Sequence, residues 1–539
     1  MELAPYILLS ILTILISGRI FKTPYDRLRL LVIPLLGVVS SIQWVVTGAS
    51  INLPDMVIWI TLGMLGWWVL ATLVSPYHHV SVSQLSLHVG SVMFAMCAFS
   101  DVNLTGVAII MAGFVLNCLY AITQNMFKYE PLKHLANKGL YQPLGFIGNT
   151  NMLGNFLVVG FFLSLLLGAQ SSWWFLVTCL ITYVIFSTSC KASYIGLAVG
   201  GLFVVVMTDS DDVNTVLVLA GIFIMLMMTV TGVKELFSAY NKRTLSERFK
   251  YWRVAWEQIK AAPLFGIGLD ALKCRVPYIQ RELNIKSNGK FLDPKTYEVP
   301  YPQKCHNDYI QMMCDVGIPG VVCYVILIVM ALLSNADPIL KGGLIAMLVT
   351  GLFMHNLHLT PINVCIWFLL FGCLRDGGGY VVSWQIVSVI VAVILTSYVY
   401  VIREVMCEYY FCKGNITKNA DLIAKGLKYC STDGNVLVNL GGICQSKHDP
   451  VGAFMYTMKG IHSYDGAIRM WELYLNAAKS QLVMGGLVLS EALAKMGLEF
   501  LPSHNESKVF VKSINDMLLK GYQVKRHLET TNESKVNGT

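Results

Sequence analysis

Charged residues are scarce in this chain. Asp, Glu, Lys and Arg make up 13% of its 539 residues and hydrophobic residues make up 55%, whereas a soluble protein carries about 25% charged residues. The sequence also lacks a CxxC pair and a dinucleotide-binding glycine fingerprint, so a zinc ribbon, a thioredoxin-like motif and a Rossmann site are unsupported. These absences exclude a large water-soluble enzyme.

The charges that are present lie in two blocks. Residues 1–233 hold 16 of them, residues 234–316 hold 23, residues 317–402 hold 4 and residues 403–539 hold 29. Because a crossing helix needs roughly 20 mostly apolar residues, this pattern predicts an all-α, polytopic membrane protein. Twelve or thirteen spans are expected, near 4–20, 29–47, 56–75, 83–100, 105–123, 152–168, 172–189, 192–208, 213–233, 317–334, 338–356, 361–374 and 382–402.

Span parity predicts that three polar segments share one membrane face. Gly145–Asn151 opens the sixth span, Ser189–Lys191 joins the seventh to the eighth, and the insert 234–316 follows the ninth. Two crossings separate each segment from the next. The basic loop 19–29 falls on the same face, and the positive-inside rule would make that face cytoplasmic. Sidedness therefore stays open at this point, and the basic residues concerned are Arg19, Lys22, Arg27 and Arg29.

The insert supplies most of the positive charge, with 14 Lys or Arg against 9 Asp or Glu. Trp252 and Trp256 follow helical spacing, and Arg248 lies one turn before Trp252. A surface helix whose cations touch lipid headgroups is the alternative to a role in binding. At the end of the insert stands His306, which is able to act as a general base near neutral pH or to be a structural histidine.

Fourteen cysteines are present. Half of them lie in or beside apolar spans, where packing is the expected role. A disulfide between Cys274 and Cys305, or between Cys407 and Cys412, would require an oxidising compartment, and the sequence leaves both open.

Four motifs in order resemble the O-antigen ligase and O-antigen polymerase superfamily of lipid-linked oligosaccharide glycosyltransferases, which includes protein O-oligosaccharyltransferases. Gly145-Phe-Ile-Gly148-Asn149-Thr-Asn151 resembles the family's G-x-x-G-N-x-N signature. Arg248-x-x-x-Trp252, followed by Pro263-Leu-Phe-Gly266-Ile-Gly268, resembles its large-loop pattern. His306-Asn307 before Gly317-Ile318-Pro319-Gly320 resembles its H-N…G-I-P-G block. The resemblance covers about residues 140–375.

The resemblance implies a GT-C-like enzyme in a bacterial inner membrane, with a large loop and an active face that are extracytoplasmic. It implies transfer of a glycan from an undecaprenyl-pyrophosphate carrier to an acceptor hydroxyl, with inversion and without a metal or cofactor. His306 is then the candidate catalytic base, and Lys191 and Arg248 are candidates for holding the donor pyrophosphate. Residues that would shape the site or bind sugar are Asn149, Asn151, Asn307, His355 and His358.

Lys191 is a departure, because the family usually has arginine there. Lysine keeps the charge but loses the bidentate fork that suits phosphate. A cation snorkelling to the interface is the alternative role. For Asn149 and Asn151 the alternative is a purely structural role at the helix entrance.

The C-terminal part is predicted to form a helical, TPR-like domain at 403–502 and a loosely ordered tail at 503–539. Lys425-Gly426-Leu427 recurs as Lys459-Gly460-Ile461, 34 residues later, which is the period of a tetratricopeptide repeat. Stacked hairpins of this kind offer a groove for a protein partner, and an ordinary helical bundle is the alternative.

The expected partners are the lipid-linked glycan, membrane lipids and an acceptor, which is lipid A-core, a protein or the growing glycan; no nucleic acid is expected. A transporter for lipid-linked sugars is the rival from another class. A transporter would place ionisable residues inside its spans or show repeated halves, and neither pattern is evident in the sequence.

Overall fold

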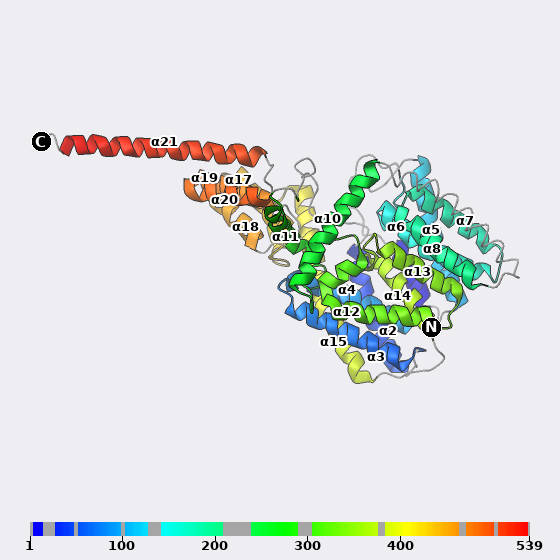
Figure 1. The fold of residues 1–539 in the computed structure, drawn as a ribbon. Helices are drawn as coiled ribbons and strands as arrows, with labels where there is room; N and C mark the ends of the chain where they lie inside the picture. Colours follow the sequence, from blue (N-terminus) through cyan, green and yellow to red (C-terminus); the bar gives the residue numbers. More distant parts are fainter. Residues whose placement is uncertain are drawn as a thin grey trace. The chain divides into compact units, whose positions relative to one another are not determined.

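The structure of the chain is a computed structural model (Figure 1). It describes residues 4–14, 27–47, 52–98, 103–127, 142–208, 239–288, 291, 304–375, 383–462, 470–500 and 505–536. The described residues form helices joined by short turns and contain no strand. They divide into two compact units, of which the first comprises 1–272 and 304–405 and the second 273–303 and 406–539. The predicted insert 234–316 is therefore shared between the units.

Apolar helices occupy twelve of the thirteen predicted spans, and the remaining one, 213–233, lies outside the described residues, as do Arg19 and Lys22. These helices are α1 Ala4–Ile14, α2 Arg27–Thr47, α3 Asp55–Val74, α4 His78–Ala98, α5 Leu104–Phe127, α6 Thr150–Gly168, α7 Trp174–Thr188, α8 Lys191–Met207, α12 Asp308–Leu333, α13 Pro338–Gly351, α14 Thr360–Leu374 and α15 Trp384–Thr417.

Seven of the described helices are long and apolar enough to cross a membrane, namely α2, α3, α4, α5, α6, α12 and α15. Four more, α7, α8, α13 and α14, are apolar but shorter. The predicted all-α, multi-pass membrane fold is thus confirmed.

Two predicted span boundaries were wrong. Helix α12 begins at Asp308 rather than near Gly317, because the Asn307 side chain accepts the N–H of Ile310 (3.0 Å) and starts the helix early. At Gly317 the backbone leaves helical geometry (φ 73°, ψ 178°), so the span that hydropathy finds is only the part after the break. Helix α15 continues to Thr417, since no glycine or proline interrupts it before Gly414.

Close backbone contact joins α8 to α13, which lie side by side (Figure 1). A Cβ placed on Gly200 would overlap the carbonyl oxygen of Gly342, and one placed on Gly196 would overlap that of Ala346. Small residues at such positions let two helices approach until van der Waals packing and weak polar contacts hold them. This contact fixes the start of α8, where Lys191 lies, relative to the helices around it.

In the second unit, α11 Leu272–Lys286 packs with the C-terminal helices. The Tyr278 ring lies edge-on to that of Phe500 (5.7 Å between centroids), and Arg281 pairs with Glu499. Sequential neighbours pack against one another along the C-terminal series. That series is α16 Ala420–Gly426, α17 Gly434–Ser446, α18 Pro450–His462, α19 Met470–Val483, α20 Leu487–Phe500 and α21 Asn505–Val536.

The tail 503–539 is more ordered than the sequence predicted, because α21 covers most of it. Phe510 and Ile514 lie one turn apart, Ile514 is fully buried, and Phe510 packs on the apolar cluster formed by α19 and α20. The low hydropathy of the tail concealed this narrow apolar stripe.

No disulfide joins any of the fourteen cysteines, all of which lie among the described residues. The pairs considered from the sequence are therefore not formed in the structure.

Gly200→Leu tests the α8–α13 contact. The added side chain has no room against Gly342, and overpacking of this kind costs about 1–3 kcal/mol. We expect a lower temperature of thermal unfolding in detergent. Gly63→Leu is the matched control, since nothing lies within 4 Å of a Cβ at Gly63; an equal loss in both variants would contradict the assignment.

Candidate active site

The buried side-chain amide of Gln124 holds the turn before α6, and the turn leads to the exposed Asn149 and Asn151. Gln124 Oε1 accepts the N–H groups of Leu144 and Gly145, both at 2.9 Å, and the following 3-10 turn is η1 Gly145–Ile147. Asn149 caps α6 by accepting the N–H groups of Asn151 (3.0 Å) and Met152 (3.2 Å). Capping of this kind satisfies donors that the helix cannot pair itself.

Arg29, from the basic loop of the sequence analysis, belongs to the same region. It is fully buried, and its guanidinium donates to the carbonyl oxygens of Leu12 (3.0 Å) and Phe146 (2.8 Å). The charge therefore cross-links α1 to the Gly145–Ile147 turn. Because Arg29 is not in an exposed loop, it does not count as evidence for a cytoplasmic face.

Lys191 is the first residue of α8. Ser189 holds a left-handed backbone (φ 54°) that turns the chain sharply between α7 and α8, and the buried Cys190 precedes the lysine. Lys191 is half-buried. Within the described part of the chain its ammonium forms no ion pair, so the charge is available at this end of the bundle.

A buried chain of polar side chains joins the ends of several helices. Ser193 Oγ donates to Asn155 Oδ1 (2.8 Å), Asn155 Nδ2 donates to Asn356 Oδ1 (2.9 Å), and Asn356 Nδ2 donates to Thr350 Oγ1 (2.8 Å). These four side chains are fully buried. Fully paired polar networks in a low-dielectric interior are strong and specific in geometry, so this chain fixes α6, α8 and α13 to the turn η2 Asn356–His358.

Asp308 ties that turn to α12. Its two carboxylate oxygens accept the backbone N–H groups of Asn356 and Leu357, each at 3.1 Å. Asn307 adds a bond from its Nδ2 to the carbonyl oxygen of Leu352 (3.0 Å). His306 and His355, which flank these contacts in the sequence, are thereby brought together.

The rings of His306 and His355 meet edge to face, with 5.1 Å between their centroids. His306 has a left-handed backbone (φ 55°). Its Nδ1 is buried and without a hydrogen-bond partner among the described residues, and the same holds for His355 Nδ1. Burial, and then the charge of Arg248, lowers the pKa of His306 to about 4. Burial, and then the neighbouring His306, lowers the pKa of His355 to about 3, so both rings are neutral at pH 7.

Arg248 lies on α10 Ala239–Ala261, close enough to both histidines for its charge to depress their pKa values. Burial also lowers the pKa of Arg248 itself, although a guanidinium stays protonated in proteins. One turn later, Trp252 Nε1 donates to the carbonyl oxygen of Cys305 (3.0 Å). The R-x-x-x-W motif therefore has a physical basis, since the tryptophan fixes α10 beside the residue that precedes His306.

The two glycine motifs contact each other directly. The N–H groups of Ile267 and Gly268 donate to the carbonyl oxygens of Cys314 (2.8 Å) and Asp315 (2.9 Å). A Cβ on Gly317 (φ 73°) would overlap the carbonyl of Leu264, and one on Gly266 would overlap the backbone of Asp315. Glycine is required at both positions because backbone meets backbone, which docks the Pro263–Gly268 turn onto the break in α12.

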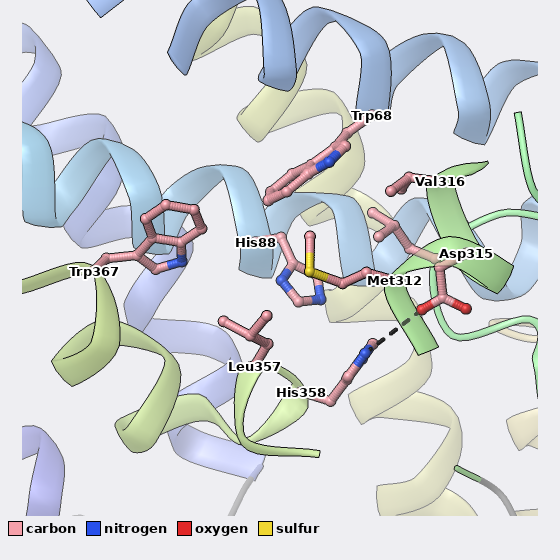
Figure 2. Close-up of a pocket in the computed structure, with 9 residues that line it drawn as sticks. Trp68, His88, Met312, Asp315, Val316, Leu357, His358 and Trp367 are labelled. Carbon is pink, nitrogen blue, oxygen red and sulfur yellow. Dashed lines mark ion pairs between the residues drawn. The ribbon is translucent and has the colours of Figure 1, made fainter. Parts of the chain in front are cut away.

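His358 lines a small cavity of about 10 Å³ (Figure 2), and neither His306 nor His355 is among its lining residues. Its Nε2 lies 3.6 Å from Asp315 Oδ2, and its ring lies edge-on to that of His88, at 5.3 Å between centroids. Trp68, from α3, and Trp367, from α14, close the cavity. A space of this size holds about one water molecule, so it is too small for a substrate.

Asp315 links this cavity to the insert. It accepts from the N–H of Asp270 (3.1 Å) and from Gln311 Nε2 (3.0 Å), and Asp270 in turn pairs with Lys304. The two contacts that involve Asp270 hold the turn after Gly268 in place, and the contact with Gln311 lies within α12. Asp315 and His358 therefore stabilise the glycine turns and are not part of the histidine cluster.

The structure thus gathers His306, His355 and Arg248 into one cluster, with Asn307 as a helix cap beside it. Lys191 and Asn151 lie in the first turns of α8 and α6, Asn149 is the N-cap of α6, and His358 lines a different cavity. The sequence analysis missed Asn155, Asn356 and Asp308. Asn155 lies one turn after Asn151 inside an apolar helix, which was a usable signal because buried amides require partners.

Within the described part of the chain, no group of three or more His, Cys, Asp or Glu side chains is arranged to hold a metal ion. The expectation of metal-independent chemistry stays a prediction.

These features define a multi-pass membrane protein whose helix ends carry a cluster of neutral histidines and a partly buried arginine. Residues 156–325 match the family model described as O-antigen ligase. The match contains Lys191, Arg248 and His306, and it supports the resemblance that the motifs show to the O-antigen ligase and polymerase superfamily. No curated protein matches the chain.

A double-mutant cycle on Asn155→Ala and Asn356→Ala tests the buried chain. Each single variant leaves a partner amide unpaired and should lower the free energy of unfolding by about 1–3 kcal/mol. The double variant should lose less than the sum, because the second truncation removes the group that the first left unpaired. Asn155→Ala combined with Ser397→Ala, whose hydroxyl bonds only within α15, should be additive. Additive losses in both cycles would refute the link.

Proposed function

We propose that the chain is a membrane glycosyltransferase of the O-antigen ligase type, with its active face on the extracytoplasmic side of a bacterial inner membrane. It transfers a glycan from an undecaprenyl-pyrophosphate carrier to an acceptor hydroxyl. One observation carries the proposal: a neutral His306 stands beside Arg248 at the helix ends of a domain that matches O-antigen ligase.

His306 acts as the general base in this mechanism. A base must be unprotonated at the working pH and within reach of the acceptor hydroxyl. Its lowered pKa keeps the imidazole neutral, and Nδ1 has no described protein partner. Removal of the hydroxyl proton makes the acceptor oxygen the nucleophile, which attacks the anomeric carbon and displaces the pyrophosphate with inversion.

The leaving pyrophosphate gains negative charge as the glycosidic bond breaks. Fixed cations stabilise such charge most where water is excluded. Arg248 is partly buried next to His306, and Lys191 has no ion-pair partner among the described residues, so these two cations are assigned to the donor. His355 packs against His306 and orients its ring.

Three acceptors are compatible with this chemistry: lipid A-core, a protein and the growing glycan. The C-terminal unit supports the protein acceptor among these three. Leu440, Ala453 and Thr457, which stand at tetratricopeptide consensus positions, are buried, and a Cβ on Gly441 would lie 3.1 Å from Thr457 Oγ1. Expression beside a lipid-linked glycan pathway, followed by analysis of which species gains sugar, distinguishes the three. A transporter would give no glycosylated product.

His306→Ala should abolish glycan transfer while the amount of chain in the membrane stays unchanged. In the wild-type protein kcat/KM should hold from pH 7 to about pH 5 and fall as pH approaches the lowered pKa near 4, because the neutral form exists above that pKa. His462→Ala, at the end of α18 in the other unit, is the control and should be fully active. Normal transfer by His306→Ala would remove the residue as the base.

Lys191→Arg should preserve transfer, and Lys191→Met should lose it by about 10²-fold or more, since one transition-state charge contact has this magnitude. The measurement is glycan transferred per unit of chain in isolated membranes. Lys250→Met is the matched control, because Lys250 pairs with Glu247 (3.4 Å) rather than facing the site. Equal activities of the arginine and methionine variants would show that charge at this position is not needed.

A further inference from the structure

Two cysteines from different segments lie in contact within the second unit. Cys407 is on α15 and fully buried, and Cys430 follows α16 and is half-buried. The Cys407 thiol lies 4.0 Å from the carbonyl oxygen of Cys430. Both belong to one apolar cluster with Ile423 and Val436, which forms the core between the end of α15 and the first hairpin, α16–α17.

The close approach depends on Gly426. A Cβ at this position would lie 3.2 Å from the carbonyl oxygen of Cys407 and 3.6 Å from its sulfur. With no side chain there, the end of α16 packs directly on Cys407. The Cys430 sulfur is also 3.7 Å from Thr432 Oγ1.

The two thiols differ in acidity. The hydrogen bond with Cys430, and then burial, raise the pKa of the Cys407 thiol. A hydrogen bond from the Cys407 side chain lowers the pKa of the Cys430 thiol, and burial opposes this effect. The thiolate is the attacking species in disulfide exchange, and Cys430 is the more exposed of the two. Cys430 is therefore the group that meets an oxidant first, and Cys407 is the buried group behind it.

We propose that Cys407 and Cys430 are a disulfide site, which when oxidised locks the end of α15 to the first hairpin of the C-terminal unit. The oxidant is a small or protein disulfide. The Cys430 thiolate attacks it, releases one thiolate of the oxidant and forms a mixed disulfide. The Cys407 thiol gives its proton to the departing sulfur as it attacks the Cys430 sulfur, and the second thiol of the oxidant is released. Two protein thiols are oxidised and one disulfide is reduced.

The partner differs from the one that proximity in sequence suggests. Cys412 is five residues after Cys407 on the same helix, which puts the two side chains about 140° apart around its axis. A bond between them would require α15 to unwind. Cys430, in contrast, already contacts Cys407 within the same apolar cluster.

Oxidation of the purified full-length chain tests the site. The protein in detergent is incubated with oxidised glutathione, its free thiols are blocked with N-ethylmaleimide in SDS, and it is then reduced and labelled with PEG-maleimide. A gel shift of two tags is expected, and peptide mass spectrometry should find the cross-linked peptide that joins Cys407 to Cys430. Cys407→Ser and Cys430→Ser should each abolish the shift.

Cys444→Ser is the matched control, since Cys444 is a half-buried cysteine of the same unit and should leave the shift of two tags intact. Absence of the cross-linked peptide from the oxidised wild-type chain would overturn the proposal, as would a two-tag shift that survives in Cys430→Ser. The wild-type measurement decides the question even if a variant fails to fold. It uses an added oxidant, so it does not depend on the compartment or on glycosyltransferase activity.

Discussion

The carboxylate of Asp308 holds the candidate site together. Two backbone N–H groups of the 356–357 turn end on its oxygens, and His306 lies two residues before it. The histidine pair therefore comes from segments almost fifty residues apart that share a single anchor. Asp308 is buried, and its partners are backbone N–H groups. These bonds therefore do not depend on which side chains stand at 356 and 357.

Around Asp308, the residues that hold the helices together differ from those proposed to take part in the reaction. Asn155, Asn356 and Ser193 join helices, and Asp315 with His358 fixes the glycine turns from behind. The Nδ1 atoms of His306 and His355 have no hydrogen-bond partner among the described residues, and these histidines, with Lys191, belong to the proposed site. Burial serves both roles: it strengthens the supporting bonds, and it keeps the histidines neutral beside an arginine.

Hydropathy predicted the membrane helices well, because a run of twenty apolar residues has few alternatives to a crossing helix. It misjudged α12 and α21, where a side-chain cap at Asn307 and a narrow stripe through Phe510 and Ile514 decide the boundaries. Motif resemblance predicted Arg248 and His306 as candidates. It gave no indication that His358 turns toward Asp315 or that Asn155 meets Asn356, because such pairings depend on contacts between helices and leave no periodic trace in the sequence.

The left-handed backbone at His306 (φ 55°) has a consequence for how this protein would respond to selection. Non-glycine residues in that conformation are strained by about 1 kcal/mol, whereas glycine adopts it freely. At this position stability and histidine chemistry are therefore opposed. A laboratory search for thermostable variants, made without a screen for activity, would favour glycine at 306 and enrich for well-folded membrane proteins that have lost the proposed base.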